Sequence, residues 1–335
     1  MPVAADTTIE VEELAKVFRG SIRALDGVTF SVRPGEIFGY LGRNGAGKTT
    51  TVRILATLTR KTSGRAVVGG IDVDADPSGV RDLVGAAMQS ASLDDLMSGR
   101  EHLELVGALA GLSKRDAKAR ADELLEAFGL AGAAGRLVAT YSGGMRRRLD
   151  LAISLVHRPR VLFLDEPTTG LDPQSRRAMW GMIRELRDGG TTILLTTQYL
   201  EEADELADRL AVINAGTIVA IGTSDELKAN VGRTTVSFRL RDPADAERVA
   251  ALAPATLLDG RTRLDLQGNG DQLTDLLVNL RQQRIGFEDL SVSEPSLEDV
   301  FVKLTGEEMD VSTESDTAVG VAAVRRYRSG VGGGA

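Results

Sequence analysis

Residues 42–49 read Gly-Arg-Asn-Gly-Ala-Gly-Lys-Thr and directly follow an apolar run, Glu36–Leu41. In a phosphate-binding loop, backbone N–H groups and the first turn of a helix surround the phosphates, and the lysine reaches their outer oxygens. An ordinary glycine-rich turn is the alternative, but the position between a predicted strand and a predicted helix disfavours it. The sequence therefore predicts a nucleoside triphosphate site formed by Gly42, Asn44, Gly45, Ala46, Gly47, Lys48, Thr49 and Thr50, in which the Thr49 hydroxyl binds Mg²⁺.

The surrounding chain predicts an α/β fold. Up to about residue 228, short apolar runs rich in β-branched residues alternate with helical patterns, which is typical of βα units and a mostly parallel sheet. The other strands expected to matter are Gly85–Gln89, Val161–Leu164 and Ile193–Thr197. Ligands of open α/β sheets gather at the carboxyl ends of the strands, so we expect the chemistry there.

Two adjacent acids, Asp165 and Glu166, end the strand Val161–Leu164. We expect Asp165 to hold Mg²⁺, mostly through its water shell, and Glu166 to orient and polarise the attacking water. A solvated strand end is the alternative. Lys48 and Glu166 are therefore predicted catalytic residues.

A third motif, Tyr141-Ser-Gly-Gly-Met, opens a helical pattern shortly before these acids. Taken alone, Ser-Gly-Gly is more often a plain helix cap. In this order and spacing the three motifs resemble the ABC ATPase family, a branch of the P-loop NTPases whose signature is usually Leu-Ser-Gly-Gly-Gln. The resemblance implies that Ser142, Gly143 and Gly144 bind the γ-phosphate held by the opposite copy in a head-to-tail dimer.

Three further residues occupy positions that the family uses. Gln89 matches a glutamine that contacts Mg²⁺ and water and hinges toward the transport partner. Asp172, in Gly170-Leu-Asp, matches the loop through which the two subunits communicate. Phe18 stands where the family places an aromatic ring that stacks on adenine, although a core phenylalanine is nearly as good a reading.

One position departs from the wider family, because Gln198 follows Thr197 where most members carry a histidine. A glutamine amide can donate a hydrogen bond to a γ-phosphate but cannot carry a proton near neutral pH. We therefore expect Gln198 to sense the γ-phosphate while Glu166 does the catalytic work. The two histidines, His102 and His157, lie in helical context and are expected to be structural. A regulatory subunit that binds ATP without hydrolysing it stays open as an alternative.

Residues 141–150 (YSGGMRRRLD), 196–204 (TTQYLEEAD) and 294–301 (EPSLEDVF) look like the daunorubicin-resistance type of exporter ATPase, and Gln198 fits that subgroup. The resemblance covers nearly the whole chain up to Gly306. It implies a partner, an integral membrane permease paired with two copies of this subunit at the cytoplasmic face of the membrane. It also implies export of a hydrophobic or amphipathic compound, such as a drug or a lipid.

The changes in sequence pattern predict the domain organisation. Residues 1–228 are expected to form the ATP-binding domain, with a helical insertion at about 90–142 that includes helices at Arg100–Ala110 and Lys114–Phe128. Residues 229–306 are expected to form a small α+β accessory domain, in which one helix covers Ala244–Leu252. Residues 307–335 are expected to be a disordered tail.

Composition excludes several other classes. The net charge of −8 disfavours nucleic acid as a partner, and the absence of cysteine excludes disulfides and thiolate metal sites. No apolar run approaches the roughly 20 residues of a membrane helix, so a membrane role is expected to depend on the permease. A GTPase would need an Asn-Lys-x-Asp segment, which does not occur, and the compact insertion disfavours DNA-repair relatives of the ABC class.

Overall fold

The computed structural model describes residues 7–89, 93–231, 234–250, 255–258, 261–266, 270–293 and 295–306. Its helices are α1 (Lys48–Leu55), α2 (Pro77–Leu83), α3 (Gly99–Leu109), α4 (Lys114–Ala127), α5 (Gly143–Ser154), α6 (Pro173–Asp188), α7 (Leu200–Leu206), α8 (Ser224–Val231), α9 (Ala246–Ala250), α10 (Gly270–Gln282) and α11 (Leu297–Thr305). Its strands are β1 (Ile9–Phe18), β2 (Ile22–Val32), β3 (Ile37–Leu41), β4 (Ser63–Val68), β5 (Ile71–Asp72), β6 (Val84–Ala87), β7 (Val161–Asp165), β8 (Thr192–Thr197), β9 (Arg209–Asn214), β10 (Thr217–Gly222), β11 (Thr234–Leu240), β12 (Ala255–Leu258), β13 (Arg261–Leu266) and β14 (Phe287–Ser293).

The central sheet brings the ends of the functional strands together. Its strand order is β10-β9-β3-β8-β7-β6, and β3 runs parallel to both β8 and β9. The register pairs Leu41 with Thr197 and Asp165 with Thr196, so β3, β7 and β8 end at the same edge. The motifs that follow these strands therefore meet there, as the α/β prediction requires.

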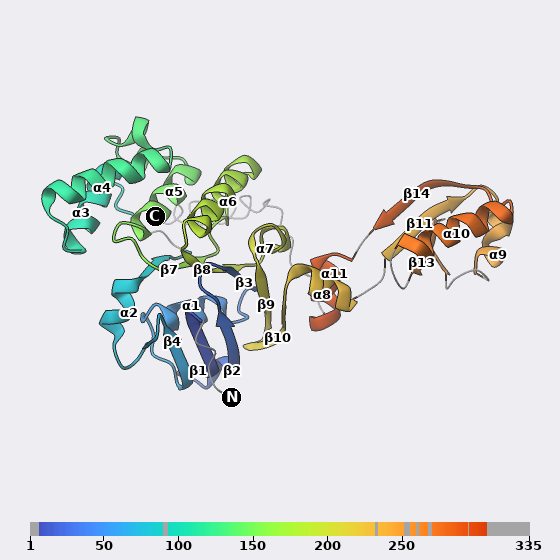
Figure 1. The fold of residues 1–335 in the computed structure, drawn as a ribbon, viewed down its shortest axis with the longest axis horizontal. Coiled ribbons are helices and arrows are strands. Elements are labelled where there is room, and N and C mark those ends of the chain that lie inside the picture. Colours follow the sequence, from blue (N-terminus) through green and yellow to red (C-terminus); the bar gives the residue numbers. More distant parts are fainter. Residues whose placement is uncertain are drawn as a thin grey trace, which may run out of the picture.

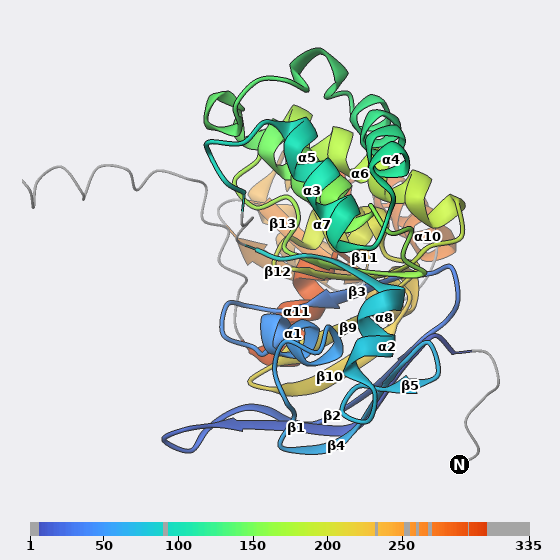
Figure 2. The ribbon, with the colours of Figure 1, turned by 90° about the vertical axis from the view of Figure 1, so that its left-hand side faces the viewer.

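Both faces of this sheet are covered, which explains its almost continuously apolar strands. Along β7, Val161 and Phe163 face a core shared with α1 and the antiparallel sheet β2-β1-β4-β5. Leu162 and Leu164 face a second core, shared with α3 to α6. Figure 2 shows the resulting layers, with α1 between the two sheets and α3 to α6 on the opposite side of the central sheet.

The C-terminal residues form a third sheet with the order β12-β13-β11-β14. Its apolar core, which includes Phe238 from β11 and Leu280 from α10, is separate from the other clusters. Helix α11 packs elsewhere, because Val300 and Phe301 share a cluster with Ala203 of α7 and Leu227 of α8 (Figure 1). The boundary after residue 228 stays a prediction, as does the accessory role of the small unit.

Some expected elements differ from the structure. The strand expected to end at Gln89 ends at Ala87, so Gln89 lies in the following loop. The helix expected over Ala244–Leu252 begins as a 3-10 turn, because Asp242 caps the Ala244 N–H and Pro243 has no N–H to give. It continues as α9 (Ala246–Ala250), and residues 251 and 252 of the expected helix lie outside the described residues. Residues 90–92 of the helical insertion and the expected tail at 307–335 lie outside the described residues.

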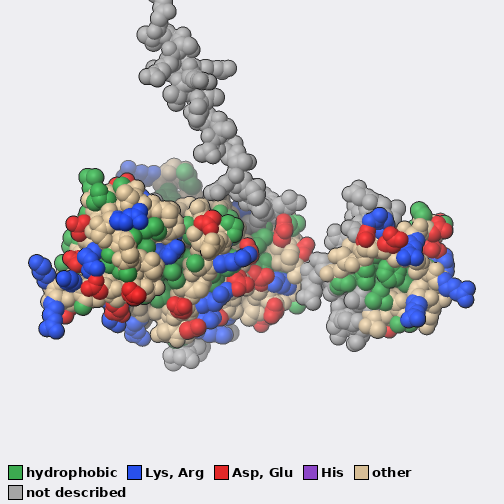
Figure 3. Space-filling view, turned by 90° about the horizontal axis from the view of Figure 1, so that it is seen from above, with side chains coloured by type: hydrophobic (Ala, Val, Ile, Leu, Met, Phe, Trp, Pro, Cys, Tyr) green, Lys and Arg blue, Asp and Glu red, His purple; other side chains and the backbone are tan. Residues whose placement is uncertain are grey.

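The described surface carries charges of both signs. Figure 3 shows Lys and Arg side chains interspersed with Asp and Glu over the face in view. This mixture differs from the concentrated basic surface of nucleic-acid-binding proteins. Among the helices that the structure describes, none combines the length and the apolar character needed to cross a bilayer.

Candidate functional site

The phosphate loop runs from the end of β3 to the start of α1, where Lys48 is the first helical residue. Gly47 has a φ of 109°, a backbone conformation that residues with a Cβ disfavour. A Cβ on Gly47 would lie 2.7 Å from the carbonyl oxygen of Ala24, and one on Gly42 would lie 2.5 Å from that of Ile213. The loop therefore needs glycine at both positions to pass between β2 and β9.

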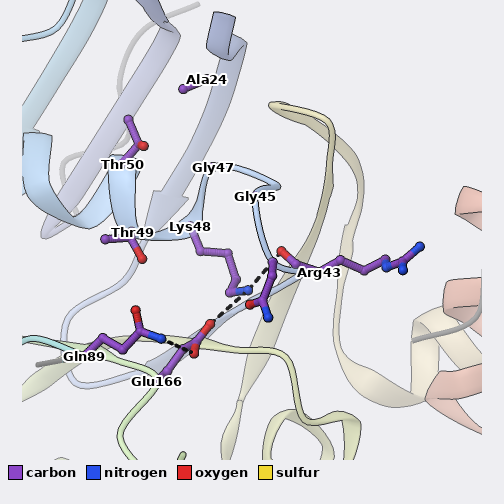
Figure 4. A pocket seen from close by; sticks show the side chains of 10 residues that line it. Ala24, Arg43, Gly45, Gly47, Lys48, Thr49, Thr50, Gln89 and Glu166 are labelled. Carbon is purple, nitrogen blue, oxygen red and sulfur yellow. Dashed lines mark hydrogen bonds and ion pairs between the residues drawn. The ribbon is translucent and has the colours of Figure 1, made fainter. Parts of the chain in front are cut away.

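This loop opens onto a cavity of about 340 Å³ (Figure 4). The predicted residues that line it are Asn44, Gly45, Gly47, Lys48, Thr49, Thr50, Gln89 and Glu166. Ala24 and Arg43 line it as well, and neither was predicted. Arg43 stands inside the quoted motif, so its position could have been inferred, but its side chain points away from Lys48. No motif marks Ala24, which reaches the loop only because β2 crosses it.

Lys48, Glu166 and Gln89 form one connected group in this cavity. Lys48 Nζ lies 3.1 Å from Glu166 Oε1 and donates a 2.7 Å hydrogen bond to the Gly42 carbonyl. Gln89 Nε2 donates to the other carboxylate oxygen, Glu166 Oε2, at 3.2 Å (Figure 4). The cavity thus places the Lys48 ammonium and the Gln89 amide within hydrogen-bonding reach of one carboxylate, that of Glu166.

The electrostatics of Lys48 balance two opposing effects. Burial lowers the pKa of Lys48, and the neighbouring carboxylates of Glu166 and Asp165 act to raise it. Lys48 is only 4% exposed, so few waters remain to stabilise its charge. A buried ammonium of this kind gains from any further anion that enters the cavity, such as a phosphate.

Thr196 of β8 holds both Asp165 and Glu166 by hydrogen bonds. Thr196 Oγ1 donates to Asp165 Oδ1 at 2.6 Å and accepts the backbone N–H of Glu166 at 3.1 Å. Glu166 has a φ of 50°, a left-handed conformation that is uncommon outside glycine and is often found at functional sites. Asp165 Oδ2 is buried and, within the described part of the chain, has no hydrogen-bond partner. Thr196 was not predicted as a site residue, and only the strand register identifies it.

Gly42 and Ala46 hold the phosphate loop in place through backbone hydrogen bonds. Gly42 and Ala46 are buried. The N–H of Gly42 donates to the Thr197 carbonyl at 3.2 Å, and the Ala46 carbonyl accepts the N–H of Gly216 at 3.0 Å. These two residues therefore act through the backbone rather than by facing the cavity.

Besides Gly42, Ala46 and Asp165, six further predicted residues do not line this cavity. Phe18 is 43% exposed at the end of β1, where the Lys16 ammonium lies 4.9 Å from its ring centroid. Gln198 is partly exposed just beyond β8, next in sequence to the residue that pairs with Leu41. The other four lie at the starts of α5 and α6 and are Ser142, Gly143, Gly144 and Asp172.

Ser142 and Asp172 both cap helices. The Ser142 hydroxyl accepts the N–H of Met145 at 3.3 Å, and Asp172 accepts those of Gln174 and Ser175 at 3.0 Å each. Ser142 and Asp172 are exposed, as is Gly143. Both helix starts are therefore accessible to a partner.

The two histidines have structural roles in this structure. His102 Nδ1 lies 2.9 Å from the Ser98 carbonyl, and its Nε2 accepts the N–H of Asp94 at 2.9 Å. His157 Nε2 lies 3.1 Å from the Val84 carbonyl. Neither lines the cavity.

Two family models match this chain. The ABC transporter family model matches residues 25–169, and the model of the DrrA1-3-like ATP-binding protein C-terminal domain matches residues 222–305. The daunorubicin resistance ATP-binding protein DrrA3 of Streptomyces coeruleorubidus is 48% identical over 312 residues, which cover 92% of this chain and 98% of that protein. The daunorubicin/doxorubicin resistance ATP-binding protein DrrA of Streptomyces peucetius is 45% identical, with 92% and 96% covered.

Among solved structures, an ATP-binding subunit of an ABC transporter is 28% identical and superposes with a TM-score of 0.61. The match covers 67% of this chain and 93% of that one. The chain therefore belongs to the ABC transporter family, as an ATP-hydrolysing subunit in the group of the daunorubicin-resistance ATP-binding proteins.

Proposed function

We propose that two copies of this chain bind two ATP molecules between them, and that hydrolysis at Glu166 drives export by a separate membrane permease. One observation carries this proposal. Lys48 and Gln89 both contact the Glu166 carboxylate in the cavity at the phosphate loop, at 3.1 and 3.2 Å. The residue proposed to bind phosphate, Lys48, and the residue proposed to activate water, Glu166, are therefore neighbours in this cavity.

Each residue of this group has a distinct task. Lys48 and the loop N–H groups bind the phosphates, and Lys48 offsets negative charge as the terminal phosphoryl group transfers. The Glu166 carboxylate accepts a hydrogen bond from the attacking water, orients it and polarises it. Gln89 holds the Glu166 carboxylate from its other oxygen.

Thr49, Gln89 and Asp165 fit a magnesium ion. The buried Oδ2 of Asp165 has no hydrogen-bond partner among the described residues, and a hydrated cation would satisfy this acceptor. A site with one carboxylate, a hydroxyl and an amide suits Mg²⁺, which keeps several waters and relies on the phosphates of its substrate. Bound Mg²⁺ would neutralise charge on the β- and γ-phosphates.

The exposed helix starts support a head-to-tail dimer. Ser142 and Gly143 are accessible at the N-terminus of α5, a position that favours an anion. We assign Ser142, Gly143 and Gly144 to the γ-phosphate bound by the other copy, and Asp172 to the contact between copies. In the closed dimer, Gln198 would donate its amide to the γ-phosphate and Phe18, with 43% of its surface exposed, would stack on adenine.

The two copies assemble with a membrane permease and lie at the cytoplasmic face of the membrane. The relatives named for daunorubicin and doxorubicin resistance support a hydrophobic or amphipathic cargo. Aromatic drugs and lipids share this chemistry.

The test is a Glu166→Gln variant, purified with its membrane partner from solubilised membranes in the presence of ATP and Mg²⁺. We expect ATP binding within about threefold of the wild type and turnover at least ~100-fold slower, the range lost with a general base. Glu201→Gln, at an exposed position on α7, is the matched control and should keep full turnover. Unchanged turnover in Glu166→Gln would reject the proposed mechanism.

The alternative left open by the sequence, a regulatory subunit that binds ATP without hydrolysing it, is disfavoured. The chain belongs to a family of ATP-hydrolysing subunits, and it carries Lys48, Asp165 and Glu166.

A further inference from the structure

Arg147 of α5 is a buried arginine, 9% exposed, that binds the backbone on both sides of Glu166. One terminal guanidinium nitrogen donates to the carbonyls of Asp165 and Glu166, both at 3.0 Å. Its Nε donates to the carbonyl of Pro167 at 2.7 Å. Three consecutive carbonyls, centred on Glu166, therefore accept hydrogen bonds from one side chain.

The other terminal nitrogen of Arg147 reaches the loop that carries Gln89. It donates to the carbonyl of Met88 at 2.7 Å and to Asp150 Oδ2 at 3.1 Å. Asp150 lies one turn further along α5 and is partly buried. Arg147 thus uses all five of its N–H groups, four on backbone carbonyls and one on a carboxylate.

Burying the charged guanidinium of Arg147 costs free energy unless each of its N–H groups finds a hydrogen-bond acceptor. Burial lowers the pKa of Arg147, and Asp150, Asp165, Glu202 and Glu166 oppose that shift. A buried charge is tolerated only when it is paired and hydrogen-bonded. Arginine suits the task because its planar fork can bind several acceptors in fixed directions, whereas lysine presents a point charge.

The hydrogen bonds from Arg147 influence the position of the Glu166 side chain, because they fix the peptide planes on both sides of Glu166. Glu166 has a φ of 50°, so its side-chain direction depends on a backbone conformation that needs outside support. Catalytic groups lose much of their effect when displaced by about 1 Å. The carbonyl of Met88 immediately precedes Gln89, the residue that holds Glu166 Oε2.

We propose that Arg147, held by Asp150, is a positioning residue that sets Glu166 and Gln89 from the helix that Ser142 caps. The inference rests on the proposed function, since it assigns Glu166 to catalysis. It adds that the helix whose start faces the partner's ATP also holds the catalytic glutamate of its own chain. Arg147 does not line the cavity at the phosphate loop and acts through these backbone carbonyls.

The chain offers a matched control in Arg120 of α4. Arg120 also binds carbonyls of its neighbours, those of Val156 at 3.2 Å and Leu155 at 2.7 Å, and also pairs with a carboxylate, Glu123. These carbonyls follow the far end of α5, away from the cavity. Arg120→Met therefore removes the same kind of interaction without reaching Glu166.

The experiment compares Arg147→Met, Arg147→Lys, Arg120→Met and Glu166→Gln in the full chain, purified with its membrane partner. For folded Arg147→Met we expect kcat to fall at least ~10-fold with ATP affinity within about threefold, because the phosphate loop is untouched. Arg147→Lys should recover only part of kcat, and Arg120→Met should keep kcat within about twofold. Adding Arg147→Met to Glu166→Gln should not slow the residual rate further, because both changes act through one group.

Two results would overturn the inference. One is a folded Arg147→Met or Arg147→Lys protein that turns over ATP at the wild-type rate. The other is an equal loss of kcat in Arg147→Met and Arg120→Met, which would indicate general structural damage. The proposed function fails separately, if Glu166→Gln itself retains turnover.

Discussion

Trp180 Nε1 lies 3.1 Å from Glu202 Oε1, in a buried contact that joins α6 to α7. The same oxygen accepts the hydroxyl of Thr168 at 2.7 Å, in the loop that follows Glu166. Burial raises the pKa of Glu202, while hydrogen bonds from Thr197, Thr168 and Trp180 act to lower it. Glu202 therefore links the loop that follows Glu166 to both α6 and α7.

Burial works against the charged form of Glu202, which makes Glu202→Gln a mild substitution. The amide has the same shape and can still accept from Trp180 and Thr168, so we expect the free energy of unfolding to change by less than about 1 kcal/mol. Glu202→Ala leaves two buried donors unpaired beside a cavity and should cost at least ~2 kcal/mol. Urea unfolding of both variants measures the difference, and equal losses would show that the hydrogen bonds from Trp180 and Thr168 contribute nothing to stability.

Asp150 predicts a pH dependence of stability. Burial raises the pKa of Asp150 to about 6, against the lowering effect of Arg147. The folded state therefore holds this proton more tightly than the unfolded state, and the stability gained from it is lost as pH rises through about 6. The stability of the wild type relative to Asp150→Asn should fall between pH 4 and pH 6.5 and then level off. A difference that rises with pH would show that the pKa is lowered instead.

Gly47→Ala should damage ATP binding through the backbone. The alanine would have to hold a φ of 109° with its Cβ 2.7 Å from the Ala24 carbonyl oxygen. We expect ATP affinity to fall at least ~10-fold, because the loop must shift away from the phosphate-binding conformation. Gly35→Ala is the control, since its φ of 70° is also left-handed but its Cβ meets open space. Calorimetric titration with ATP should leave the Gly35→Ala affinity unchanged.

Because Lys48 and Glu166 form a buried ion pair, we expect the stability losses caused by substituting each of them to be non-additive. Lys48→Met alone leaves the Glu166 carboxylate buried without its cation, at 5% exposure, and should lower the free energy of unfolding by roughly 3 kcal/mol. Combining Lys48→Met with Glu166→Gln removes both charges and should recover part of that loss. Urea unfolding without nucleotide completes the double-mutant cycle. Simple addition of the two losses would mean that the pair contributes nothing.

The parts of the site that could be predicted from the sequence are those encoded by local pattern. Glycines followed by Lys48, after a buried strand, specify the loop, and the adjacent acids at the end of β7 specify Asp165 and Glu166. The sequence could not predict whether the side chains of Phe18 and Gln198 line the cavity, because this depends on how far their segments extend past the edge of the sheet. In the structure neither residue lines it. Their roles, like those of Ser142 and Asp172, stay predictions.

Other features escape local pattern because tertiary structure creates them. Arg147 is one basic residue in a run of three, a pattern that normally marks a solvated helix face. Only the fold brings the carbonyls of Met88, Asp165, Glu166 and Pro167 to its side chain. Likewise, the apolar face of α11 predicts that it is buried, but not that Phe301 packs beside α7 and α8.

Mixed dimers test the head-to-tail site most directly. Lys48→Met disables the phosphate loop, and Ser142→Asp keeps the helix cap but opposes the γ-phosphate with a negative charge. Complexes carry two differently tagged copies, with the two changes either on separate copies or on the same copy. If each site joins Lys48 of one copy to Ser142 of the other, separate copies retain one intact site and a substantial part of the ATP turnover, whereas both changes on one copy damage both sites. Turnover that survives only when both changes share a copy would contradict this arrangement and would place each complete site within a single chain.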